Sequence, residues 1–458
     1  MNIKIAAMAL VSLIVCSCDT SNKLNDYGTG GYEVCSAEYL RWTAFQFAKD
    51  HYYYADHLPL TVDIEQYSST YSMIRDIRYE PIDHFSFSVT GDEYNSAFIS
   101  GNYDGFGFSW QYDSSEHALM ITQIHDGPAR QVGMNRGDKI LSINGYTAAD
   151  VSNMYDNNQS SLVWQHPEGK TGSDFVWQPA SGETQKTQYI ESGTISVRTV
   201  QAYQVFDNAD SHIGYLSYQR FGQYGEQDLD DAVSYFKQQN VDELIVDLRL
   251  NPGGAVYLAQ KLASSILPQT DIGLDLIHID YLDKPHVVEF DYMKDSWLKV
   301  VQTPSHLALS RLYVLTSEQS CSASELLINS LKPYIDVIQI GSTTCGKPMG
   351  MNPVSYCSSG ENGGEVFSIV NFESINANGE GHYYDGIAPQ CTVTENGILP
   401  WGDAGDSLTA AALNHIHNGS CDSVVAVNAA IRLSTPDKKI ISRPNVNYQA
   451  EYKLVNHF

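Results

Sequence analysis

The chain has 458 residues, of which 54 are acidic and 27 are basic, so its formal net charge is −27. A charge of this sign repels the phosphate backbone of nucleic acids and argues against a nucleic-acid partner. At roughly 150 residues per domain the length allows about three domains, and a hydrophobic fraction of 43% is that of an ordinary globular protein.

The first 18 residues have the pattern of an export signal. Lys4 precedes an apolar run over residues 5–15, which is too short to span a bilayer as a folded helix. The string Val-Cys-Ser-Cys that ends at Cys18 resembles the bacterial lipobox, and this resemblance makes Cys18 the lipidated first residue of the mature chain. Residues 19–34 are polar and predict a tether. We therefore expect an exported lipoprotein, anchored to a membrane of the bacterial cell envelope on its periplasmic side or at the cell surface. An ordinary cleaved signal peptide is the alternative.

Residues 35–100 predict a small, mainly helical N-terminal region. Ser36 is a candidate N-cap for a helix that carries Leu40, Ala44 and Phe47 on one face. The region also contains the string Asp-His-Phe-Ser-Phe at 83–87, to which we assign a packing role.

Residues 101–200 change to short alternating strands separated by glycine turns. An apolar strand at 118–121 is followed by Gly-Asp-Lys-Ile-Leu-Ser-Ile-Asn-Gly at 137–145, and this arrangement resembles a PDZ domain. The resemblance implies that a glycine-aromatic loop binds a C-terminal carboxylate and that the strand after it accepts a peptide by strand addition. The loop consists of Gly105, Phe106, Gly107 and Phe108. A small barrel without a ligand is the alternative.

Residues 205–402 alternate between strands and helices, which predicts an α/β core with its active residues at the carboxyl ends of the strands. The predicted strands are at 213–218, 244–248, 312–315 and 337–340, with helices around Leu229–Phe236, after Gly254 and from Ala323. Residues 403–458 begin with a helix at 408–416 and end in a polar tail.

Three short strings within this core contain the candidate catalytic residues. Ser322 opens the string Ser-Ala-Ser-Glu, Lys347 follows 25 residues later (347 − 322), and Gly253 and Gly254 end a buried strand in a tight turn. A hydroxyl nucleophile, an amine that could deprotonate it and backbone N–H groups of a glycine turn are the three parts of an acyl-transfer site.

The order of PDZ domain, glycine turn, serine string and Gly-Lys resembles the C-terminal processing (tail-specific) serine peptidases, over roughly residues 35 to 403. The resemblance implies a ClpP/crotonase-like core, protein or peptide substrates and a Ser-Lys dyad. In this dyad Ser322 is the nucleophile and Lys347 the general base. The implied oxyanion hole is formed by the backbone N–H groups of Gly253 or Gly254 and of Ala323.

Other residues of these strings have supporting roles. We expect Asp247 and Arg249 to hold the glycine turn in place. A free lysine has a pKa of about 10.4, and burial beside Met349 is expected to lower it by about two to three units. Members of the resembled family usually carry a glutamine four residues after the lysine, where this chain has Met351. Asn352 is the candidate for a third catalytic member.

Six cysteines remain beyond the signal segment. They are Cys35, Cys321, Cys345, Cys357, Cys391 and Cys421. Outside the cytoplasm they could pair in any of 15 connectivities, and spacing does not choose among these. For the two beside the dyad we expect small buried packing residues, with a redox switch or a thiol nucleophile as alternatives. The chain has neither a Cys-x-x-Cys nor a His-Glu-x-x-His string, so we expect no metal and no cofactor.

Two other functions stay open. The first is a binding lipoprotein for peptides or hydrophobic ligands on the same fold, with the dyad present but not assembled, as in retinoid-binding relatives of this fold. The second is a polysaccharide-binding lipoprotein, suggested only by the 30 tyrosines. The retained serine, lysine and glycine turn favour the enzyme.

Overall fold

The structure is a computed structural model, and it describes residues 28–166, 168–208, 211–281, 296–360 and 363–421, together with the backbone of 443–444. The signal segment with Cys18, most of the tether and most of the polar tail lie outside the described residues. Within these ranges, no helix combines the length and the apolar composition that a bilayer span requires.

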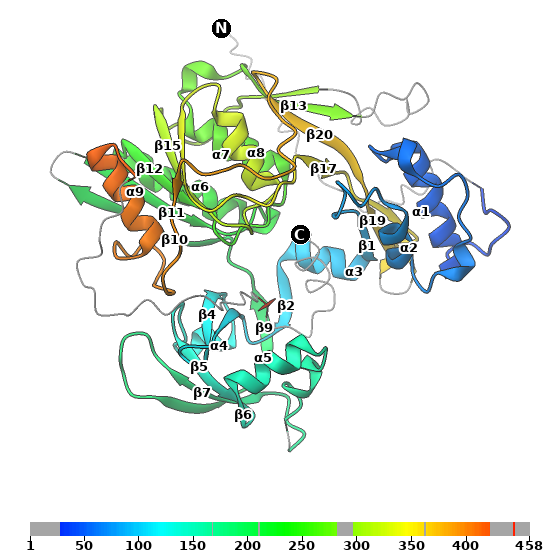
Figure 1. Cartoon of the computed structure of the whole chain (residues 1–458), viewed down its shortest axis with the longest axis horizontal. Helices are drawn as coiled ribbons and strands as arrows, with labels where there is room; N and C mark the ends of the chain where they lie inside the picture. The colour runs from blue at the N-terminus through cyan, green and yellow to red at the C-terminus, as the bar shows by residue number, and fades with distance from the viewer. Residues whose placement is uncertain are drawn as a thin grey trace, which may run out of the picture.

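The centre of the molecule is a six-stranded sheet with helices on both faces (Figure 1). Its order is β10 (Val200–Asn208), β11 (Ser211–Tyr218), β12 (Glu243–Asp247), β15 (Arg311–Thr316), β16 (Asp336–Gly341) and β21 (Cys391–Thr392). All neighbours from β11 to β21 are parallel, and β10 is an antiparallel edge. Strands buried on both faces read as continuous apolar runs, which is why the sequence predicted β11, β12, β15 and β16. The two edge strands, β10 and β21, were not predicted.

Four helices enclose this sheet. Helices α6 (Glu226–Gln238), α7 (Val256–Ile266) and α8 (Ala323–Leu331) share one apolar cluster on one face, and α9 (Ser407–Asn418) covers the other face. The sequence predicted all four. On α6, Leu229, Val233 and Phe236 are buried, as their spacing required.

A second layer lies beyond α8. It is a four-stranded sheet of order β14 (Ser296–Lys299), β13 (Asp275–Tyr281), β20 (Val370–Asn376) and β17 (Met349–Met351). A three-stranded sheet of β1 (Phe87–Thr90), β19 (Glu365–Ser368) and β18 (Val354–Tyr356) is next to it in the chain, since β19 runs almost directly into β20. This second layer was not predicted from the sequence.

The N-terminal region, blue in Figure 1, contains α1 (Ala37–His51), α2 (Thr70–Ile77), α3 (Gly91–Tyr94), short 3-10 turns at Ala55–His57 and Ile64–Gln66, and a π-helical turn at Asn95–Ser100. Ser36 caps α1 as predicted, because its hydroxyl accepts the N–H of Tyr39 at 3.1 Å. The region is mainly helical, but it is not a self-contained unit. The region also contributes β1, and its apolar cluster includes Met349 and Val370 of the second layer.

The domain at residues 102–196 lies below the core and has its own sheets, a larger one built on β3, β4, β5, β7 and β8 and a two-stranded one of β2 and β9 (Figure 1). Its elements are β2 (Asn102–Gly105), β3 (Phe108–Asp113), β4 (Ala118–Ile124), α4 (Pro128–Gln131), β5 (Lys139–Ile143), β6 (Tyr146–Thr147), α5 (Ala148–Asp156), a 3-10 turn (Ser160–Leu162), β7 (Ser173–Gln178), β8 (Lys186–Ile190) and β9 (Gly193–Ser196). Phe106 and Phe108 of the glycine-aromatic loop are buried in its core.

The outer edge of β3 is paired with the chain itself. The backbone of β22 (Arg443–Pro444) runs antiparallel to β3, with Arg443 opposite Trp110 and Pro444 opposite Ser109. This is the edge that the sequence assigned to an added peptide strand.

Candidate active site

Ser322 and Lys347 line one cavity of about 460 Å³, between the carboxyl edge of the central sheet and the second layer. Its walls are largely aromatic and apolar, and they include Phe87, Tyr94, Phe98, Phe221, Ile279 and Phe372. The cavity therefore takes side chains from the core, the second layer and the N-terminal region.

Ser322 stands at the start of α8 in a left-handed backbone conformation, with φ 55°. The glycine turn makes room for it. A Cβ atom on Gly253 would lie 2.8 Å from both the Cys321 carbonyl oxygen and the Ser322 Cβ, closer than real Cβ atoms come. Gly253 also has φ +103°, so a side chain at this position would be strained as well as crowded.

The structure distinguishes the candidate backbone donors of the predicted oxyanion hole. The N–H of Gly253 donates to the Asn251 side-chain oxygen at 2.8 Å, and Gly253 is buried. Gly254 is exposed and lines the cavity. In the described part of the chain, no protein acceptor takes the N–H of Gly254 or of Ala323. Of the two glycines offered by the sequence, Gly254 is therefore the one whose N–H is available, together with that of Ala323 at the N-terminus of α8.

Glu325 joins the serine segment to the lysine segment. One oxygen of its carboxylate accepts the backbone N–H groups of Ser322 and Lys347, at 2.9 and 2.8 Å. The other accepts the N–H of Gly346 at 2.8 Å and the hydroxyl of Thr344 at 2.6 Å. Burial raises the pKa of this carboxyl, and the hydrogen bonds oppose that rise. The signal for this residue was in the sequence, because Ser-x-x-Glu at a helix start is a capping-box pattern.

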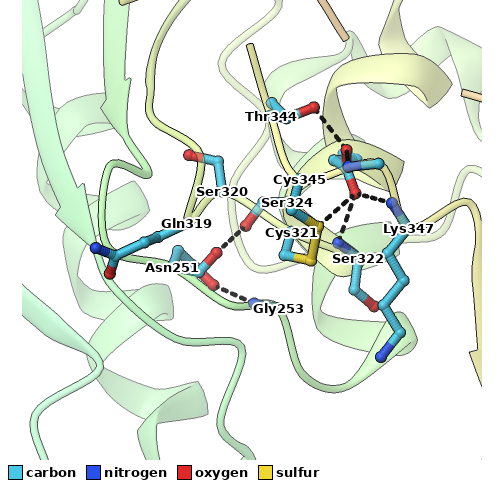
Figure 2. Close-up of a disulfide and its surroundings, with 12 residues drawn as sticks. Asn251, Gly253, Gln319, Ser320, Cys321, Ser322, Ser324, Thr344, Cys345 and Lys347 are labelled. Carbon is cyan, nitrogen blue, oxygen red and sulfur yellow. Dashed lines mark hydrogen bonds between the residues drawn. A yellow bond between two sulfur atoms is a disulfide. The ribbon is translucent and has the colours of Figure 1, made fainter. Parts of the chain in front are cut away.

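A disulfide crosses the same two segments. Cys321 directly precedes the serine, Cys345 lies two residues before the lysine, and their sulfur atoms are bonded, with 5.2 Å between the Cα atoms. Figure 2 shows the side chains of Ser322 and Lys347 extending away from this disulfide toward the same side. Cys321 is buried as expected, but the two side chains are bonded to each other, and the bond removes the thiol nucleophile as an alternative. The remaining pairs are Cys35–Cys357 and Cys391–Cys421.

These disulfides bear on metal binding. Among the described residues, the two groups with suitable spacing are Cys321, Glu325 and Cys345, and Cys391, His415 and Cys421. In both groups the sulfur atoms are bonded to each other, and a thiolate, not a disulfide, is the usual metal ligand. The donor sets therefore do not fit a metal in this state.

Lys347 is buried, with 4% of its surface exposed. Loss of solvation by burial lowers the pKa of its amine to about 7, against the opposing effect of the Asp83 and Glu325 carboxylates. Its Nζ atom lies over the ring of Phe85, 4.7 Å from the ring centre. An amine with this pKa is substantially neutral at neutral pH and can accept a proton.

The strand that precedes the glycine turn is anchored by a buried ion-pair network. Arg249 pairs with Asp247 at 2.6 Å and with Asp406 and Glu395 at 2.9 Å each. The hydroxyl of Tyr215 also donates to Asp247, at 2.7 Å. These contacts agree with the structural role expected for Asp247 and Arg249.

Comparison with known protein families and structures identifies proteins that are similar to this chain. Residues 212–393 match peptidase family S41, and residues 97–162 match the PDZ domain. The chain therefore carries a peptidase S41 region and a PDZ domain. Its relatives include the carboxy-terminal processing proteases CtpA and CtpB of Bacillus subtilis (strain 168). CtpA is 25% identical over 309 residues, covering 67% of this chain and 60% of CtpA. CtpB is 22% identical over 297 residues, covering 65% of this chain and 56% of CtpB.

The aligned region thus spans about 60% or less of the length of these S41 relatives. The fold is shared with a crystal structure of an S41 protein from Bacteroides fragilis NCTC 9343, with a TM-score of 0.64 and 21% sequence identity. That likeness covers 83% of this chain and 97% of the other.

Two of the predicted features, the third catalytic member and the peptide-binding loop of the PDZ domain, stay predictions. Asn352 lines the cavity, but its side-chain amide donates to the hydroxyl of Tyr281 at 2.7 Å and its backbone N–H to Asn371 at 3.1 Å. Its role as a third catalytic member stays a prediction. The four residues of the PDZ loop do not line the cavity. Sequence reasoning missed Phe85, which we had assigned to packing alone and which lies over the lysine amine.

Proposed function

We propose that the chain is a serine endopeptidase that hydrolyses peptide bonds of protein substrates through a Ser322–Lys347 dyad. The observation that carries this proposal is the single cavity lined by Ser322, by Gly254 and by a buried lysine with a pKa of about 7. The names of the relatives support the reaction class. The parallel sheet with helices on both faces supports assigning the core to the ClpP/crotonase-like class.

In this mechanism neutral Lys347 takes the proton of the Ser322 hydroxyl while the oxygen attacks the carbonyl carbon of the scissile bond. The resulting oxyanion accepts the N–H groups of Gly254 and Ala323. The C–N bond then breaks, and the protonated lysine gives its proton to the leaving amine. A water molecule hydrolyses the acyl ester by the same route and restores the serine.

The PDZ domain would capture the substrate chain, with residues Gly105–Phe108 at its carboxylate loop. The edge of β3 is the place for an added strand, and because β22 pairs there a substrate would have to displace it. We further propose that the protein is exported and anchored through a lipid on Cys18, which the lipobox pattern supports. Replacing Cys18 with alanine should then move the protein from the membrane fraction to the soluble fraction.

The test of the reaction is Ser322→Ala. We expect it to abolish both peptide hydrolysis and labelling by a fluorophosphonate, with unchanged circular dichroism, because only the attacking oxygen is removed. The matched control is Ser355→Ala, an exposed serine outside the cavity, which should keep full activity. Near wild-type hydrolysis by Ser322→Ala would move the nucleophile to Ser324. Binding of peptides without hydrolysis by the unmodified protein would instead support the binding lipoprotein, which the comparisons do not favour.

A further inference from the structure

Phe85 and Phe87 of the N-terminal region form one wall of the space around Lys347. The ring of Phe85 faces the Nζ atom of Lys347 at 4.7 Å, and Phe85 itself is buried. Two residues further on, Phe87 lines the same cavity. The face of an aromatic ring carries negative potential, so it attracts the ammonium form of the lysine and fixes where the amine rests.

Asp83 holds this wall in place. Its side chain is fully buried, and one carboxylate oxygen accepts the N–H groups of Phe85 and Ser86, at 2.8 and 2.9 Å. The other accepts the hydroxyl of Ser86 at 2.5 Å. The same hydroxyl oxygen accepts the N–H of Val370 at 3.0 Å. Because Val370 begins β20, which pairs with β17 just after the lysine, the wall and the lysine segment are fixed to one sheet.

The five positions that follow Lys347 carry no charged side chain. Position 351 carries a methionine, and the amide of Asn352 donates to Tyr281. Besides Asp83, the charge that acts on the amine is that of Glu325, which already accepts four hydrogen bonds. The charged or titratable side chains that line the cavity together with Lys347 are Arg220, Tyr94, Tyr257 and Tyr281.

We propose that Asp83 and Phe85 are positioning residues for Lys347: the ring face and the buried carboxylate hold its amine toward Ser322 and set the pH at which it becomes neutral. The inference rests on the proposed function in that Lys347 is taken as the general base. The predicted effect on the pKa of Lys347 can be measured without any hydrolysis of substrate. A negative charge and a ring face both favour the charged amine, whereas burial favours the neutral one, and the balance of these effects places the working range near neutral pH.

The experiment measures the titration of Lys347 directly, by pH-dependent competitive acetylation with acetic anhydride and mass spectrometry, in a Ser322→Ala background. Asp83→Asn keeps an oxygen acceptor for the two backbone N–H groups and removes the charge. We expect the midpoint for Lys347 to fall by about 0.5–1 pH unit, because the group that favoured the ammonium form is gone. Phe85→Leu keeps an apolar side chain without the ring face and should also lower the midpoint. The matched control is Phe47→Leu, a buried ring of the same apolar cluster that does not line the cavity.

With Ser322 restored, the acid limb of the pH profile for fluorophosphonate labelling should move by the same amount in Asp83→Asn. An unchanged midpoint in both variants would overturn the proposal and leave the segment a purely structural role, even if activity fell. If Asp83→Asn fails to fold, Phe85→Leu decides alone. If the midpoints shift as expected but the unmodified protein is never labelled at Ser322, the proposed function fails while the positioning of Lys347 stands.

Discussion

The two halves of the dyad are held by different means. The serine half is fixed through its backbone: Glu325 accepts the N–H of Ser322, a disulfide begins at the preceding residue, and Gly253 packs against the serine Cβ. The amine of Lys347 lies at the end of a long side chain and is held by burial and by the ring of Phe85. The position of the serine is thus fixed by contacts of its backbone, whereas the pKa of the lysine is set by the groups around its amine.

Kinetic measurements can test this difference. Substitutions in the serine half should lower the rate of acylation without shifting its pH dependence. Substitutions around the lysine should also shift the pH dependence, since the neutral fraction of the base changes. Glu325 contacts both segments and should show both effects.

The largest effect is expected for Lys347→Ala, which should lower the acylation rate by about 10²–10⁴-fold. Lys347→Arg should not restore activity, because a guanidinium cannot lose its proton in this pH range.

In the unmodified protein the acylation rate should rise with pH, with a midpoint at about 7, and level off above it, since the neutral amine is the active form. Single-turnover acylation between pH 5 and 9 measures both. Lys237→Ala, on the exposed face of α6, is the control, and a flat profile in the unmodified protein would contradict the prediction.

The next largest effect is expected for Glu325→Gln. The amide has one oxygen where the carboxylate has two, so some of the four donors lose their acceptor, at about 1–3 kcal/mol for each unsatisfied group. We predict a loss of roughly 10–100-fold in acylation rate and a lower midpoint of the pH profile, because Glu325 also favours the charged form of Lys347. A loss of rate with no change in midpoint would assign Glu325 to the serine half alone.

A smaller effect should follow from removing the disulfide at the site with Cys321→Ser and Cys345→Ser together. The chain-entropy model for a loop of this size gives a loss of about 3 kcal/mol in the free energy of unfolding. The acylation rate should fall by about 3–10-fold with an unchanged pH midpoint, since a cost of about 0.7–1.4 kcal/mol from misplacement of the serine corresponds to such a factor. Removing Cys391 and Cys421 in the same way is the matched control. It should lower stability but not the rate, because neither residue lines the cavity.

The smallest effects are expected at the position of the absent glutamine. Asn352→Ala removes a hydrogen bond to Tyr281, and Met351→Gln adds an amide beside a lysine that is already held. We predict changes below about threefold for both, which is less than 1 kcal/mol. A larger fall for Asn352→Ala, measured by the same single-turnover assay, would make Asn352 the third catalytic member after all.

The sequence allowed the meeting of Ser322 and Lys347 in one cavity and the central parallel strands to be predicted, because their signals are local. Ser322, Lys347 and the glycine turn sit in short strings, and the strands of the core are continuous apolar runs. The contribution of Phe85 was not predictable in this way. Its string reads like any aromatic packing cluster, and only the fold brings it to the lysine. The disulfide pairing had the same limit, because spacing alone left all 15 connectivities open.

The pairing of β22 with β3 has a consequence for affinity. While Arg443 and Pro444 occupy the edge of β3, a substrate tail can bind only to the fraction of molecules in which that edge is open. Its apparent dissociation constant rises in inverse proportion to that fraction. Because both strands belong to one chain, this increase in the apparent dissociation constant does not depend on protein concentration. Peptides with low intrinsic affinity would therefore stay largely unbound at any protein concentration, and a chain truncated after residue 421 should bind the same peptides more tightly.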